Sequence, residues 1–88
     1  MPEATDRGEV AGRIRGYLLS EVLLDDSAEL TDETPLLSGL LDSIALMDVV
    51  AFLEDEFGVA LEYGDVDATN FRTVGHIAAL VSRRTAEA

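Results

Sequence analysis

Three segments of this 88-residue chain carry apolar side chains at the spacing of an α-helix. They cover about residues 9–24, 43–57 and 74–83, and in each the apolar positions recur every three or four residues, which forms one stripe along a helix. Such stripes must be buried against one another, and so short a chain supports one small core. The pattern therefore predicts an all-α fold: a small four-helix bundle of three main helices and one short helical turn at 64–69, with a long ordered loop at 25–42 before the second helix.

The ends of the predicted helices carry capping residues. Asp42 is placed to cap the second helix, Gly58 to end it and Thr73 to cap the third. The buried stripe of the second helix is predicted to be Leu46, Val49, Val50, Leu53 and Phe57. The inward side of the third is predicted to be Val74, Ile77, Ala78 and Val81. Five leucines should anchor the loop before the second helix: Leu30, Leu36, Leu37, Leu40 and Leu41.

The domain prediction is one folded unit at 9–84 between a flexible N-terminal tail, 1–8, and a C-terminal tail, 85–88. The longest apolar runs contain five residues each, Val49 to Leu53 and Ile77 to Val81, which excludes a transmembrane helix and the apolar region of a secretory signal. We therefore expect a cytoplasmic monomer. A free-standing protein and a domain excised from a larger synthase both fit this pattern.

The charge is strongly acidic and unevenly distributed. Eighteen acids and six bases give a formal net charge of −12, every base is an arginine, and residues 17–71 contain no base at all. Such a surface repels nucleic acid and anionic lipid, so neither is expected as a partner. It attracts basic protein surfaces and accelerates encounter with them. A solvated acidic face that only maintains solubility is an equally open explanation.

Several kinds of site can be excluded. The chain has no cysteine, which removes disulfides, thiolate metal clusters and a cysteine nucleophile. Ser43 and His76 could be imagined in a hydrolase triad, but no G-x-S-x-G motif is present. Asp65-x-Asp67-x-Thr69 resembles the start of a calcium loop, yet Asn70 and His76 occupy the positions that need glycine and glutamate. We therefore predict no catalytic residue and no metal site.

The segment that remains is Gly39-Leu40-Leu41-Asp42-Ser43-Ile44. A serine at a helix start often has only a structural role. Here it follows the cap, in the first turn of a helix that is reached from a long loop, where its hydroxyl should face solvent. The free backbone N–H groups of a helix start favour a phosphate.

This segment and three others resemble, in order and spacing, the acyl carrier protein family with its peptidyl and aminoacyl branches. The others are Thr34-Pro35-Leu36-Leu37, Leu53-Glu54-Asp55-Glu56-Phe57-Gly58 and Asn70-Phe71-Arg72-Thr73-Val74. The resemblance implies a four-helix carrier in which Ser43, flanked by Asp42 and Ile44, receives 4′-phosphopantetheine from coenzyme A. A separate phosphopantetheinyl transferase performs that step with magnesium. The thiol of the arm then holds a substrate as a thioester, so the chain itself is no enzyme.

Leu40-Leu41 before Asp42 is more similar to discrete carriers than to housekeeping fatty-acid carriers. The leading hypothesis is an acyl or aminoacyl carrier of polyketide or nonribosomal-peptide biosynthesis. Its expected partners are the transferase, an adenylating or acyl-transfer loading enzyme, and downstream synthases, transferases or tailoring enzymes. A carrier for fatty-acid synthesis or D-alanine is the alternative, and an unmodified acidic helical adaptor is the alternative from another class.

The side of the second helix opposite its buried stripe mixes apolar and acidic residues. It comprises Ile44, Met47, Asp48, Ala51, Glu54 and Asp55. Apolar side chains beside acids suit a surface that docks partner enzymes, with acids for steering and apolar groups for contact. The alternative is that Ile44 and Met47 pack beneath the 25–42 loop, whose leucines need neighbours.

Overall fold

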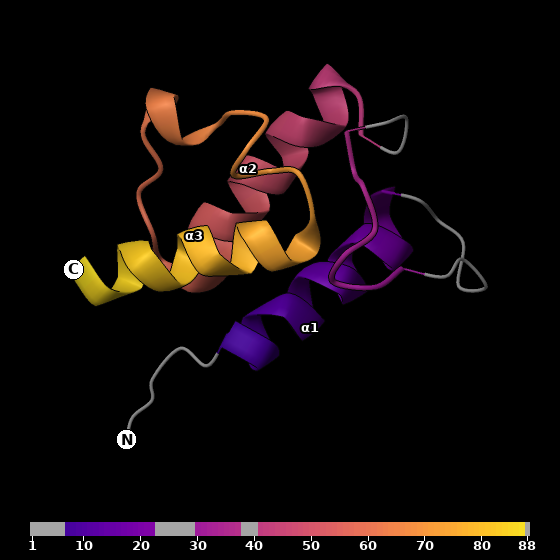
Figure 1. Cartoon of the computed structure of the whole chain (residues 1–88). Helices are drawn as coiled ribbons and strands as arrows, with labels where there is room; N and C mark the ends of the chain where they lie inside the picture. Colours follow the sequence, from indigo (N-terminus) through magenta and orange to yellow (C-terminus); the bar gives the residue numbers. More distant parts are fainter. Residues whose placement is uncertain (1–6, 23–29, 38–40, 88) are drawn as a thin grey trace.

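The computed structural model describes residues 7–22, 30–37 and 41–87, and this part of the chain is helical without any β-strand (Figure 1). Its elements in chain order are α1 (Arg7–Tyr17), a π-helical turn η1 (Leu18–Val22), α2 (Ser43–Phe57), a 3-10 turn η2 (Tyr63–Asp65) and α3 (Val74–Glu87). The prediction of an all-α fold with three main helices is confirmed. Two parts of the predicted 25–42 loop, residues 25–29 and 38–40, lie outside the described residues.

The predicted bounds of the second helix are confirmed at both ends. The first helix was predicted at 9–24; it gives way to the π-helical turn η1 after Tyr17, and residues 23–24 lie outside the described residues. Its start is earlier than predicted, and the third helix ends later than predicted. Helix α1 begins at Arg7, and α3 continues to Glu87. Residues 7–8 and 85–87, assigned above to flexible tails, are therefore helical. The extra turn of α3 is supported by Thr85 Oγ1, which donates to the Ser82 carbonyl (3.0 Å), and by an ion pair between Arg84 and Asp65.

The short fourth helix predicted at 64–69 is replaced by the 3-10 turn Tyr63–Asp65 and a series of turns. Asp67 explains where this turn stops, because its carboxylate accepts the backbone N–H of Asn70 at 2.7 Å. A side chain that bonds the backbone in this way competes with continued helix.

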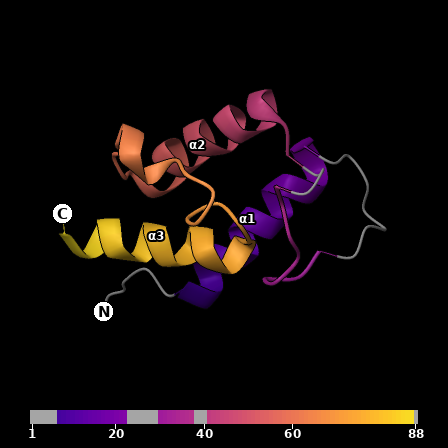
Figure 2. The same cartoon turned by 45° about the horizontal axis from the view of Figure 1, so that its top comes forward.

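The three helices surround one core (Figure 2), and the most extensive helix–helix contact joins α1 to α3. The core takes apolar side chains from every helix and from the connections: Val10, Ile14, Leu18, Leu36, Leu41, Val49, Val50, Leu53, Phe71, Val74, Ile77, Ala78, Leu80 and Val81. All four residues predicted to face inward from the third helix are buried. None of the helices in the described part of the chain has the length and apolar character needed to span a bilayer.

The predicted stripe of α2 is only partly correct. Val49, Val50 and Leu53 are buried, but Leu46 and Phe57 are half-buried and pack at the edge of the core. Phe57 lies edge-on to Phe52 with ring centroids 6.0 Å apart. Phe52 in turn stacks on Tyr17 of α1 at 4.1 Å, so that a small aromatic cluster covers this side of the α1–α2 contact.

The segment before α2 is anchored by leucines, as predicted for Leu36 and Leu41. Both are buried, the backbone N–H of Leu36 donates to the Arg72 carbonyl, and that of Leu41 donates to the Leu36 carbonyl, each at 2.9 Å. Leu30 is half-buried and Leu37 is exposed, while Leu40 lies outside the described residues. The anchored segment delivers the chain to Asp42 at a defined place.

Candidate functional site at the start of α2

Helix α2 starts at a well-formed cap. Asp42 is extended (φ −94°, ψ −175°), and its Oδ1 accepts the backbone N–H of Ala45 at 2.7 Å. At the other end, Gly58 has the left-handed conformation (φ 66°) that glycine adopts readily, and its N–H donates to the Glu54 carbonyl at 3.0 Å. The sequence-based assignment of both caps is therefore confirmed.

Ser43 is the first residue of α2 and is exposed. Figure 1 shows this helix start at the upper edge of the molecule, away from both chain ends. Within residues 7–22, 30–37 and 41–87, nothing accepts a hydrogen bond from the backbone N–H of Ser43 or of Ile44, and the Ser43 hydroxyl has no partner. An exposed hydroxyl beside two unsatisfied N–H groups at the positive end of a helix fits a covalently attached phosphodiester.

The surface beside this helix start is acidic. Asp48 lies on α2 with its carboxylate exposed, and the Tyr17 hydroxyl donates to the Asp48 carbonyl at 3.3 Å. Partial burial raises the pKa of Tyr17, and the carboxylates of Asp48 and Glu21 raise it further. Tyr17 therefore stays a neutral hydrogen-bond donor that ties α1 to α2 across the aromatic cluster.

The six residues predicted to form a docking face are all exposed on α2: Ile44, Met47, Asp48, Ala51, Glu54 and Asp55. The two large apolar ones stand out, because Ile44 is 76% exposed and Met47 is 59% exposed. The described part of the preceding loop, residues 30–37 and 41–42, does not cover them. These six side chains, called the α2 face below, thus share one exposed side of the helix.

Glu54 has a structural contact that sequence reasoning missed. Its Oε2 accepts the backbone N–H of Leu61 at 3.0 Å, which ties the segment after α2 back onto the helix. A hydrogen bond across seven residues of irregular chain leaves no periodic pattern in the sequence. Glu54 therefore cannot serve as a purely functional probe of the α2 face.

The structure also places a groove next to the α2 face. Met47 and Val50 form one wall, and the segment after α2 forms the other, in a hollow of about 460 Å³ whose lining is completed by Leu61, Glu62, Tyr63, Gly64, Val66 and Asp67. Met47 is one helical turn from Ser43, so the groove begins beside the candidate attachment site. Sequence reasoning missed it; the only signal was a tyrosine within a polar stretch.

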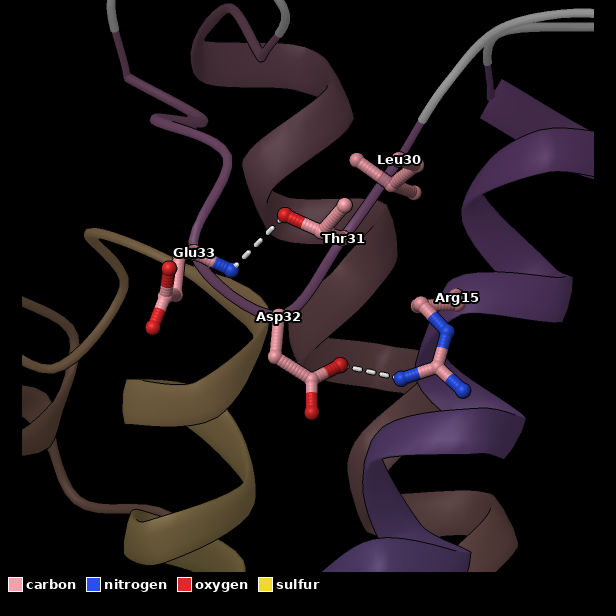
Figure 3. Close-up of a pocket in the computed structure, with 5 residues that line it drawn as sticks. All are labelled: Arg15, Leu30, Thr31, Asp32 and Glu33. Atoms are coloured by element: carbon pink, nitrogen blue, oxygen red, sulfur yellow. Dashed lines mark hydrogen bonds and ion pairs between the residues drawn. The ribbon is translucent and has the colours of Figure 1, made fainter.

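A second hollow lies between α1 and the segment 30–33, and its lining is mainly polar (Figure 3). Arg15 of α1 points into it and pairs with the Asp32 carboxylate, and Thr31 Oγ1 accepts the backbone N–H of Glu33 at 3.2 Å. These polar groups satisfy one another, and no residue of α2 lines this hollow. It therefore serves to join the loop to α1.

The remaining candidates of the sequence analysis take structural places. His76 is in the first turn of α3, where its Nδ1 lies 2.7 Å from Thr73 Oγ1 and its backbone N–H donates to the same oxygen at 3.1 Å. Asp65 pairs with Arg84 rather than joining Asp67 in a loop. Among the residues that the structure describes, no three His, Asp or Glu side chains are grouped to hold a metal ion.

Comparison with known proteins defines the class of protein first. Residues 13–81 match the family described as "Phosphopantetheine attachment site". The chain is 33% identical over 79 residues to the acyl carrier protein of Thermotoga maritima, covering 89% of this chain and 94% of that protein. It is 36% identical over 73 residues to the acyl carrier protein of Saccharopolyspora erythraea, covering 82% and 74%.

The chain therefore belongs to the acyl carrier protein family, whose members are non-catalytic carriers with covalently attached 4′-phosphopantetheine. Ser43 and the whole of α2 lie inside the matched range. The helix start described above presents an exposed hydroxyl, and its first two backbone N–H groups have no partner among residues 7–22, 30–37 and 41–87.

Proposed function

We propose that Ser43 receives the 4′-phosphopantetheine group from a phosphopantetheinyl transferase. The observation that carries this assignment is the exposed Ser43 hydroxyl on the first residue of α2, next to two backbone N–H groups that have no partner in the described part of the chain. Asp42 holds that turn in shape through Ala45, and the buried Leu41 fixes the approach of the chain. Ile44, which follows Ser43 in the motif, is also exposed.

The thiol of the bound group supplies the thioester chemistry, and the protein presents the attached acyl or aminoacyl group to partner enzymes. We place this carrier in polyketide or nonribosomal-peptide biosynthesis, on the strength of the Leu40-Leu41-Asp42-Ser43 pattern. Fatty-acid synthesis and D-alanine transfer are the alternatives within the same chemistry. The acid that a cognate loading enzyme attaches distinguishes them.

The α2 face is the proposed contact surface for these enzymes. Its exposed apolar pair, Ile44 and Met47, stands among three acids, Asp48, Glu54 and Asp55. Exposed apolar side chains contribute little to folding, whereas a ring of acids speeds encounter with a basic partner. A carrier that visits several enzymes needs fast encounter more than tight binding. We propose that it acts as a monomer in the cytoplasm, through the single domain of residues 9–84.

The attachment is tested by intact-mass spectrometry after incubation with coenzyme A, magnesium and a transferase of broad specificity. We expect one added phosphopantetheine group on the wild-type protein and none on Ser43→Ala. Ser20→Ala is the matched control, since Ser20 is also exposed but its hydroxyl is bonded to the Gly16 carbonyl at 2.8 Å. The helical circular dichroism signal should be the same in all three proteins.

Modification that maps to Ser20, Ser27, Ser38 or Ser82 would contradict the assignment. A wild-type chain that takes up no group from any transferase would instead support the unmodified helical adaptor.

A further inference from the structure

Among the arginine side chains that the structure describes, that of Arg72 has no polar partner. It is exposed just before α3, and neither a hydrogen bond nor an ion pair joins it to any residue in 7–22, 30–37 and 41–87. The other described arginine side chains are all paired: Arg13 with Glu9 and Glu56, Arg15 with Asp32, Arg83 with Asn70, and Arg84 with Asp65. In a chain of eighteen acids and six bases, an arginine without an acid calls for an explanation.

The backbone of Arg72 is tied to the chain that leads to Ser43. The Arg72 carbonyl accepts the Leu36 N–H, and the Leu36 carbonyl accepts the Leu41 N–H, each at 2.9 Å. Both leucines are buried, and Leu41 is two residues before Ser43. The segment before α3 therefore lies beside the segment that enters α2 (Figure 2), and it brings an exposed cation to the approach of the candidate attachment site.

The prosthetic group would add negative charge where the surface is already acidic. Its phosphodiester is an anion, and Asp42 and Asp48 are exposed near the start of α2. The backbone N–H groups of Ser43 and Ile44 can donate to the phosphate, but they carry only partial charge. A guanidinium brings a full positive charge and a fork of donors that matches phosphate oxygens. A cation from outside α2 would therefore offset the repulsion.

The acids of this region do not use the Arg72 guanidinium. Glu33 is exposed three residues before Leu36 and is not paired with Arg72. The Oδ1 of Asp42 accepts the Ala45 N–H as the cap of α2. The guanidinium is thus available for an anion that joins the protein after it has folded.

We propose that Arg72 binds the phosphodiester of the 4′-phosphopantetheine group at Ser43. The guanidinium donates to the phosphate oxygens from the segment before α3, and the backbone N–H groups of the helix start donate from α2. The contact holds the base of the arm where these two segments meet. The inference rests on the proposed function, and it adds to that site a residue distant from it in the chain.

The direct test compares the full chain with and without the group by NMR. In isotope-labelled wild type, the Nε–H resonance of Arg72 should shift on modification, whereas that of Arg83, near the end of α3, should not. The phosphorus resonance of the phosphodiester should differ between wild type and Arg72→Gln. Arg83→Gln is the matched control, since Arg83 is also exposed, and it should keep the wild-type phosphorus resonance.

Thermal unfolding measures the strength of the contact without any enzyme. Because Ser43 and Arg72 come together only in the folded chain, a contact through the phosphate should raise the melting temperature. The gain on modification should be roughly 1–5 °C greater for wild type than for Arg72→Gln, and this difference should shrink as salt is raised. Arg72→Lys should keep part of the gain, because lysine retains the charge without the fork. Comparing each variant before and after modification removes the effect of the substitution itself.

The NMR comparison decides the proposal. An Arg72 resonance that does not move on modification, with the same phosphorus resonance in Arg72→Gln and wild type, would overturn it and leave the proposed function standing. Slower modification of Arg72→Gln, with unchanged resonances in the finished product, would assign Arg72 to the encounter with the transferase and coenzyme A and overturn it equally. If the wild-type chain is not modified at Ser43, the proposed function and this inference fail together.

Discussion

The first turns of α2 and α3 have the same kind of cap but different surroundings. Asp42 accepts the N–H three residues ahead at 2.7 Å, and Thr73 does the same at 3.1 Å. At α3, however, the Asp32 carbonyl also accepts the Gly75 N–H at 2.9 Å, so the loop closes over that helix start. Gly75 permits this approach, since a Cβ there would lie 3.2 Å from the Asp32 oxygen.

The difference shows that a capped helix becomes a candidate attachment site only when the rest of the fold leaves it open. The start of α3 is closed by Asp32, which Arg15 holds in place, and its first residue Val74 is buried. The start of α2 has an exposed serine in the same position and two N–H groups without described partners. Local capping chemistry is shared, and tertiary contacts decide which start can accept a phosphodiester.

The largest expected difference between the two helix starts comes from truncating an isoleucine near each of them to alanine. Ile77 in the first turns of α3 is fully buried, whereas Ile44 of α2 is 76% exposed. Ile77→Ala should lower the free energy of unfolding by about 2–5 kcal/mol. Ile44→Ala should change it by less than about 0.5 kcal/mol and yet slow modification of Ser43. Urea denaturation and transferase kinetics measure the two effects; equal destabilisation would show that Ile44 belongs to the core.

Removing the two caps should have a smaller effect on stability and should separate their roles. Asp42→Ala and Thr73→Ala are each expected to cost about 0.5–2 kcal/mol, because each leaves a helix N–H without its acceptor. Only Asp42→Ala should also slow modification, since it loosens the turn that holds Ser43. The check is the modification rate at a temperature where both variants are fully folded, and equal rates would break the proposed distinction.

Neighbouring acids of the α2 face should give a still smaller difference in stability. Glu54→Arg removes the acceptor of the Leu61 N–H and should cost about 0.5–1.5 kcal/mol, whereas Asp55→Arg should cost less than about 0.5 kcal/mol. Both reversals should slow association with a basic partner enzyme, and the slowing should shrink as salt is raised. Stopped-flow association at two ionic strengths measures this; an effect independent of salt would rule out electrostatic steering.

The smallest expected effect is a change in the pH dependence of stability, and it concerns Asp65, which touches neither helix start. Its ion pair with Arg84 lowers the pKa of the Asp65 carboxyl, and the Glu62 N–H and nearby Arg83 add to the shift. Because the folded pKa is below the unfolded one, the stabilisation is complete above about pH 4 and is lost as pH falls through the folded value. Urea denaturation at pH 7 and pH 3 should therefore show a smaller pH dependence for Asp65→Asn than for wild type. An unchanged dependence would contradict a role for this carboxyl.

The parts that sequence reasoning predicted correctly depend on residues close together in the chain. The bounds of α2 follow from Asp42, Gly58 and an apolar repeat between them, and the start of α3 follows from Thr73. One error occurred where a distant residue intervenes, and another where a local side chain bonds the backbone. Helix α3 continues past Arg83 because Arg84 forms an ion pair with Asp65. The turn at Tyr63–Asp65 stays short because the Asp67 carboxylate accepts the backbone N–H of Asn70.

The sequence by itself determined the helical class, the place of Ser43 in the first turn of α2 and the acidic character of the surface, since periodicity, capping and charge are local properties. Only the tertiary structure decided that this helix start stays open while that of α3 is closed by Asp32. It alone also placed Tyr63 opposite Met47 across the groove. The physical reason is that exposure and grooves arise from packing between segments distant in the chain, which no short pattern of residues encodes.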